Sequence, residues 1–283
     1  MVMKRSVFFV GILLAAGWGS LSILTDTHLR AEHLPACISG FCDVVVPAPE
    51  VNPASRVQAD GTIPRGQANI IAMAGALEMA IKDGYPFPQD ATWLLEHDYL
   101  PHAICRPGGL PEDSASLDGA KGGDFTLDSQ SGQFSLSIVG LPGRMKVEAD
   151  PGKILTGLLE TPSLHRDLLA TDSLARRMFV QARWITNAGR LGATWPDRVA
   201  AKGGNLNFPD ASLAALAPWL PCTGLVNLVT GEPLAEGMGP GEVTIESVAG
   251  IVGDRPGRGY RVSVHHPSGA DLSWKIMLAQ PPN

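Results

Sequence analysis

Clusters of basic residues are missing from this sequence. Its 283 residues include 22 lysines and arginines against 28 aspartates and glutamates, which gives a formal net charge of −6 at pH 7. A nucleic-acid partner requires a basic face that neutralises phosphates. We therefore expect the protein to bind no nucleic acid.

The short motifs of common enzyme classes are missing as well. There is no G-x-S-x-G nucleophile turn, no G-K-[ST] ending of a phosphate-binding loop, no G-x-G-x-x-G after a strand and no H-E-x-x-H. The cysteines do not form the two close pairs of a structural zinc site. We predict no catalytic residue, no cofactor and no bound metal, and hence a protein that is not an enzyme.

One segment gathers side chains of the kinds that bind metals, and it keeps an enzyme open as an alternative. Glu96, His97, His102 and Cys105 lie within ten residues of one another. The spacing of His102 and Cys105 suits one helical turn, but Pro101 prevents a helix that also contains His97.

Charge is missing from a long stretch near the N-terminus. Met1–Arg5 carries two positive charges, and Ser6–Leu24 then runs for 19 residues without a charge. A helix of that length spans about 28 Å, close to the roughly 30 Å hydrocarbon core of a bilayer. We predict a transmembrane anchor that places the rest of the chain outside the cytoplasm. A cleaved signal peptide is the alternative.

Cysteine is scarce, but its number is even. Four cysteines in a chain that crosses a membrane suggest disulfides. A bridge between Cys37 and Cys42 would close a small local loop and leave Cys105 to pair with Cys222. The sequence does not choose among the three formally possible pairings, so all four residues are disulfide candidates.

The rest of the sequence divides into repeated blocks. After an anchor or signal segment at 1–30, residues 31–64 form a proline-rich linker with a cysteine loop. Residues 65–155 and 156–283 then each run from a helix-like stretch through Leu-Pro and a cysteine to three strand-like stretches. The predicted fold class is α+β: an N-terminal transmembrane or signal helix, then two tandem modules, each a helix packed on a small antiparallel sheet.

Periodicity gives the expected elements. Apolar residues three or four positions apart predict helices over 65–84, with Gly84 as the cap, and over 163–190, where Gly189 and Gly192 end the helix. Alternation of apolar and polar residues predicts strands at 124–128, 133–139, 144–149, 242–248, 259–266 and 271–278.

Two groups of side chains have a predicted place but no predicted chemistry. The pair His265–His266 falls at a strand end and is expected on the surface, with its two side chains on opposite faces of the strand. Four tryptophans follow or belong to the helical segments and are expected in the core, with stacking on a carbohydrate as the alternative. They are Trp93, Trp184, Trp195 and Trp219.

The segment ALEMAIKDGYPFPQDATWLLEHDYLPHAIC, residues 76–105, joins a helix end, an aromatic-proline turn, a short helix and a Leu-Pro exit. Together with the apolar N-terminus, it resembles type IV pilin-like proteins, namely the minor pilins and the pseudopilins of type II secretion. The resemblance implies a head in which an antiparallel sheet packs on a helix. The prepilin peptidase site of that family has no counterpart here, and no glutamate occurs before Glu32, which implies an uncleaved anchor and an accessory role.

The expected function is that of a membrane-anchored protein of the bacterial cell envelope, held in the inner membrane with its head in the periplasm or on the cell surface. It would serve as a pilin-like structural or accessory subunit of a pilus, secretion or conjugation apparatus. Its expected partners are other envelope, pilus or secretion proteins, and the membrane itself. The alternative is an exported periplasmic binding module for a peptide, a glycan or an envelope protein.

Overall fold

The structure is a computed structural model that describes residues 62–86, 90–110, 113–130, 133–151, 163–221 and 224–281. The described chain forms two units in sequence, each with a long helix, at least one short helix and a three-stranded antiparallel sheet. The first unit consists of α2 (Thr62–Lys82), α3 (Ala91–Glu96), β1 (Phe125–Gln130), β2 (Gln133–Ile138) and β3 (Arg144–Val147). The second consists of α4 (Ser163–Thr171), α5 (Ser173–Thr194), α6 (Pro196–Ala201), α7 (Leu213–Leu216), η4 (Ala217–Trp219), β4 (Val243–Val252), β5 (Arg255–His265) and β6 (Asp271–Ala279).

Helix α2 is buried on all sides along most of its length. Every residue from Gly66 to Ile81 is buried, because the helix is apolar and rich in small side chains that let its neighbours approach closely. The predicted cap is confirmed: Gly84 has a φ of +87°, and the amide of Tyr85 donates to the carbonyl of Ala80 at 3.1 Å. Glycine adopts this left-handed conformation without steric cost, which is why the helix ends here.

The second long helix differs from its prediction at both ends. One helix is expected over 163–190, but the chain divides into α4 and α5 at Asp172, whose carboxylate caps α5 by accepting a backbone amide at 3.0 Å. Gly189 and Gly192 do not end the helix. They lie inside it, because other side chains, such as the ring of Tyr260, occupy the space that a Cβ would need.

Both sheets are antiparallel meanders, with β2 and β5 as their central strands. All six predicted strands are present. The hairpin between β4 and β5 is tighter than the sequence suggests, since Val252 pairs directly with Arg255. Gly253, with a φ of +65°, supplies the turn between them.

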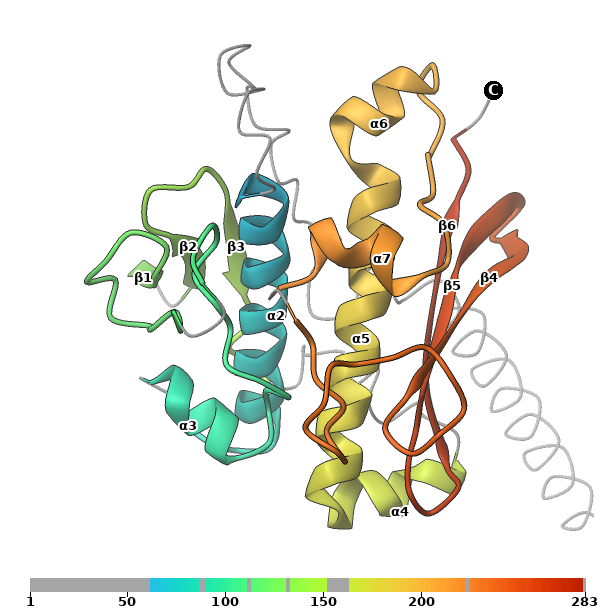
Figure 1. Cartoon of the computed structure of the whole chain (residues 1–283). Helices are drawn as coiled ribbons and strands as arrows, with labels where there is room; N and C mark the ends of the chain where they lie inside the picture. Colours follow the sequence, from blue (N-terminus) through green and yellow to red (C-terminus); the bar gives the residue numbers. More distant parts are fainter. Residues whose placement is uncertain are drawn as a thin grey trace, which may run out of the picture.

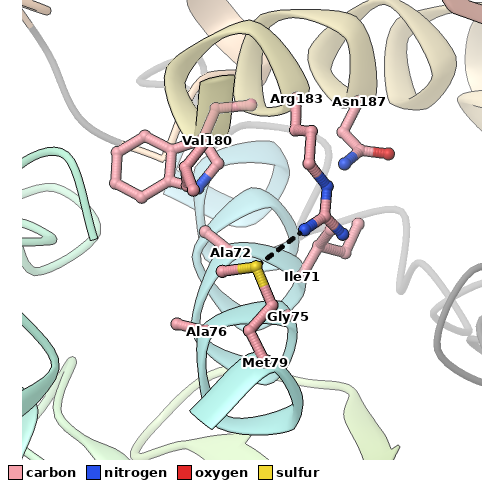
Figure 2. Close-up of a pocket in the computed structure, with 9 residues that line it drawn as sticks. Ile71, Ala72, Gly75, Ala76, Met79, Val180, Arg183 and Asn187 are labelled. Carbon is pink, nitrogen blue, oxygen red and sulfur yellow. Dashed lines mark hydrogen bonds between the residues drawn. The ribbon is translucent and has the colours of Figure 1, made fainter. Parts of the chain in front are cut away.

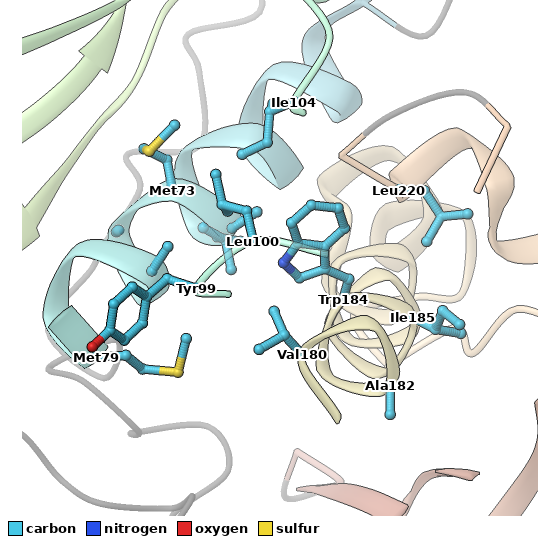
Figure 3. Packing of buried hydrophobic residues seen from close by; sticks show 14 of the residues in the cluster. Met73, Met79, Tyr99, Leu100, Ile104, Val180, Ala182, Trp184, Ile185 and Leu220 are labelled. Carbon is cyan, nitrogen blue, oxygen red and sulfur yellow. The ribbon is translucent and has the colours of Figure 1, made fainter. Parts of the chain in front are cut away.

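The two long helices lie side by side in the middle of the molecule, and each carries its own sheet on its outer side (Figure 1). Strands β2 and β3 pack on α2, and strands β5 and β6 pack on α5. One continuous cluster of buried apolar side chains runs through both helices and both sheets. Trp184 of α5 lies on the side of its helix that faces Leu100 and Ile104 of the first unit (Figure 3).

The predicted fold class is wrong in its first element. In the ranges that the structure describes, no helix combines the length and the apolar character needed to cross a membrane. The predicted anchor Ser6–Leu24 itself lies outside these ranges, as does the linker up to residue 61. The last linker residues, 62–64, form the first turn of α2 instead. Only the α+β part of the prediction agrees with the two small sheets and their helices.

The prediction of disulfides is contradicted as well. Cys105 is the single cysteine among the described residues; it is buried, and these residues contain no disulfide. Cys37, Cys42 and Cys222 lie outside them. The predicted boundary between the two modules, at 155 and 156, also falls outside the described residues.

Candidate functional site

A hollow opens where α2 and α5 meet (Figure 2). It measures about 270 Å³ with its open side included, and inside it there is room for about one water molecule. The wall is apolar except for Arg183 and Asn187. Its lining comprises Ile71, Ala72, Gly75, Ala76 and Met79 of α2, and Val180, Arg183, Trp184 and Asn187 of α5.

A second hollow, of about 190 Å³ with its open side, continues along the same two helices. It shares Ile71, Ala72, Trp184 and Asn187 with the first hollow and extends to Trp219 and Pro221. We call the two hollows together the seam groove. It follows the contact between the two units of the chain.

Arg183 is the unusual side chain of the seam groove. It projects from the middle of α5 toward α2, and only 7% of its surface is exposed. Its Nη1 donates to the sulfur of Met79 at 3.2 Å (Figure 2), and its guanidinium lies over the ring of Trp274, 5.1 Å from the centroid. A thioether is a weak acceptor, and within the described ranges it is the only acceptor that Arg183 has.

Arg183 therefore has one weak hydrogen bond within the described residues, and its other donors reach the opening. Burial lowers the pKa of its guanidinium to about 10, against an opposing effect of the negative charge of Glu78. Arg183 stays cationic at neutral pH, since this pKa is still far above 7. Glu78 is only 1% exposed and accepts the backbone amide of Glu148 at 2.9 Å. No ion pair joins Arg183 to a carboxylate of the described residues, although buried charges are normally paired.

Gly75 leaves the space beside the guanidinium open. A Cβ at this position would lie 3.7 Å from Nη2 of Arg183, an ordinary van der Waals contact. Alanine would therefore fit, and it would favour the helix by roughly 0.5–1 kcal/mol. The packing does not require glycine here, and its effect is to leave Nη2 uncovered. Asn187, one helical turn after Arg183, brings its side-chain amide to the same wall (Figure 2).

The four residues considered for a metal do not come together. Glu96 is exposed on α3. His97 stacks on Trp93, with ring centroids 3.9 Å apart, and its Nδ1 lies 2.9 Å from the carbonyl oxygen of Trp93. Cys105 is buried in the core. Among the described residues there is no group of three or more histidine, cysteine or acidic side chains that could hold an ion.

His102 instead links the two units. Its Nε2 lies 3.0 Å from the amide nitrogen of Gln181, which also donates to the carbonyl of Val226 at 2.9 Å. Beside it, Arg177 donates to the carbonyl of Pro101 at 2.7 Å. Burial, followed by the positive charge of Arg177, lowers the pKa of His102 to about 4. The imidazole is therefore neutral at neutral pH and acts as an acceptor between the units.

The expectation that His265 and His266 lie on the surface is wrong. They are 6% and 8% exposed, and they form separate contacts. Nδ1 of His265 lies 2.6 Å from Asp271 and its Nε2 lies 3.3 Å from the hydroxyl of Thr244. Nε2 of His266 lies 3.4 Å from Asp172, the cap of α5. These contacts join neighbouring strands and the end of a helix, which accounts for the burial of both rings.

The four tryptophans belong to the core, as predicted. Trp184 and Trp219 are buried, and Trp93 and Trp195 pack against the same apolar cluster while remaining partly exposed. Two of them, Trp184 and Trp219, also line the seam groove.

Sequence reasoning missed the seam groove and Arg183. The available signal was weak: a single basic residue inside the apolar helical stretch FVQARWIT, residues 179–186. Comparison of the chain with known protein families, with curated proteins and with solved structures found no match in any of the three. The resemblance to pilin-like proteins therefore stays an untested prediction.

Proposed function

We propose that the protein is a binding module, whose seam groove receives part of another molecule, and that it performs no chemistry of its own. The observation that carries this proposal is the guanidinium of Arg183, a cation buried among apolar side chains at the wall of an opening. None of the nitrogens of Arg183 is both buried and without a partner, so its remaining donors reach the open side of the groove, where a ligand that supplies acceptors would replace water on them.

The composition and the position of the groove support the same proposal. Ligand sites are usually apolar hollows with a few polar groups, and they often lie between structural units. The seam groove has this character, and both walls are long helices within one continuous core. Such walls would hold the binding residues in place before a ligand arrives.

This function corresponds to the binding module that the sequence offers as the alternative to a pilin-like subunit. Its test is a panel of peptides, glycans and small organic molecules titrated into the full chain, with tryptophan fluorescence as the readout. Because Trp184 lines the groove, we expect at least one class of ligand to change the emission, and we expect the Trp184→Phe variant to lose most of that change.

Trp93→Phe is the matched control, because Trp93 is a partly buried tryptophan that does not line either hollow. It should leave the ligand response unchanged. The proposal is contradicted if no class of ligand alters the emission at millimolar concentration, or if the response survives intact in Trp184→Phe.

A further inference from the structure

We infer that the group bound in the seam groove is a carboxylate and that Arg183 is the residue that recognises it. This inference rests on the proposed function, because it names the chemical class that the same groove takes. It starts from the donors of Arg183. A guanidinium has five N–H groups in a planar fork, and the one hydrogen bond that Arg183 forms within the described residues goes to the sulfur of Met79.

The geometry places unused donors beside the opening. Nη1 faces Met79 on α2, while Nη2 lies next to Gly75, where the helix has no side chain. A carboxylate matches two parallel N–H groups of a guanidinium and forms shorter, stronger hydrogen bonds with them than a neutral acceptor does. The gap at Gly75 is therefore where a carboxylate oxygen would approach Arg183.

Charge and size favour a carboxylate over a phosphate. Among the residues that the structure describes, Arg183 is the only cationic side chain in the lining of either hollow, and the carboxylate of Glu78 is close enough to affect its pKa. A phosphate monoester carries a charge of about −1.5 to −2 at neutral pH, so Glu78 would repel it more strongly. The first hollow has room for about one water-sized oxygen, which suits a carboxylate oxygen better than a tetrahedral group.

The other lining residues of the groove indicate which kind of molecule carries the carboxylate. Ile71, Ala72 and Val180 offer an apolar surface next to the opening, and Asn187 offers one amide. A carboxylate on a short aliphatic chain fits this surface. It could belong to a free organic acid or to the acidic side chain of a polypeptide, and the experiment separates these two sources.

The experiment titrates propionate and propionamide into the full chain and follows tryptophan emission. We expect propionate to reach half-saturation at a concentration at least tenfold lower than propionamide, because the amide lacks the negative charge and one acceptor. A second arm compares the blocked peptides acetyl-Gly-Glu-Gly-amide and acetyl-Gly-Gln-Gly-amide. Tighter binding of the glutamate peptide than of propionate assigns the carboxylate to a polypeptide, and the reverse order assigns it to a free acid.

Three variants locate the binding. Arg183→Met should abolish the preference for propionate over propionamide. Gly75→Ala should weaken propionate binding at least threefold without unfolding the chain, since the added methyl group would fit at 3.7 Å from Nη2 of Arg183. Gly122→Ala adds a methyl group where nothing lies within 4 Å and should leave binding unchanged.

The outcomes separate the inference from the proposed function. Equal binding of propionate and propionamide, or a preference that persists in Arg183→Met, would overturn the carboxylate inference and leave a groove that binds neutral groups. Failure of every probe in both arms, together with no response to the broader panel of ligands, would overturn the proposed function as well.

Discussion

From the surroundings of His102 we predict that acid lowers the stability of the fold. The structure lowers its pKa from an ordinary 6.5 to about 4, so the folded state favours the neutral imidazole. At neutral and higher pH the ring is neutral in both the folded and the unfolded state, so His102 does not lower the free energy of unfolding there. As the pH falls below 6.5, the unfolded chain takes up a proton that the folded chain refuses, and the free energy of unfolding falls. The loss is complete below the folded pKa of about 4.

The interval between the two pKa values sets the size of the effect. At about 1.4 kcal/mol per pKa unit, the full loss is about 3 kcal/mol, of which about 2 kcal/mol is already lost at pH 5. This is a large share of the stability of an ordinary domain, about 5–15 kcal/mol. The charged neighbour of His102 is Arg177, which adds to the cost of protonation.

The assay is urea denaturation at a series of pH values between 8 and 4 for the full chain and for His102→Gln. Glutamine has an oxygen that can accept from Gln181, but it does not titrate. The difference in unfolding free energy between the two proteins should shift by about 2 kcal/mol in favour of the variant between pH 8 and pH 5. Carboxylates that titrate in both proteins cancel in this difference. A difference that stays constant over the whole range would refute the account of His102.

Two further substitutions test the packing. Gly189→Ala should lower the free energy of unfolding by about 1–3 kcal/mol, because the new Cβ overlaps the ring of Tyr260; urea denaturation against Gly122→Ala as the control measures this, and equal stability of the two variants would contradict it. Asp124→Asn should lower the free energy of unfolding by about 2–3 kcal/mol, because the carboxylate is 1% exposed and accepts a hydrogen bond from Arg106 at 2.8 Å. Although burial alone would raise the pKa of Asp124, its hydrogen bonds lower it. The loss of unfolding free energy in Asp124→Asn should therefore become smaller as the pH falls through the acidic range. A loss that is the same at pH 7 and pH 3 would argue against this bond.

The sequence predicts the features of this fold that depend on neighbouring residues. Alternation locates all six strands, since each strand has one buried face whatever packs on it. The end of α2 follows from Gly84, whose φ of +87° is a local property of glycine. The order of helices and strands in both units can be predicted from the sequence for the same reason.

The features that the sequence does not predict depend on residues far away in the chain. Gly189 resembles a helix terminator, yet its role is set by Tyr260, a residue of another element. Arg183 resembles one charged residue on an amphipathic helix, and its burial follows from contacts with distant residues, namely Met79, 104 residues away, and Trp274. The histidines at 265 and 266 look exposed at a strand end, but Asp172, at the start of α5, lies beside His266 in the fold. In each of these cases, tertiary packing determines the surroundings of the residue.

The most direct test of the central claim observes the guanidinium of Arg183 itself. In an NMR spectrum of the full chain that resolves arginine Nε–H groups, the signal of Arg183 is the one that disappears in Arg183→Lys. Titration with acetate should move this signal progressively to a limit, while acetamide at the same concentrations should leave it in place. A signal that stays fixed under acetate, or that moves equally with acetamide, would contradict the claim that Arg183 recognises a carboxylate in the seam groove.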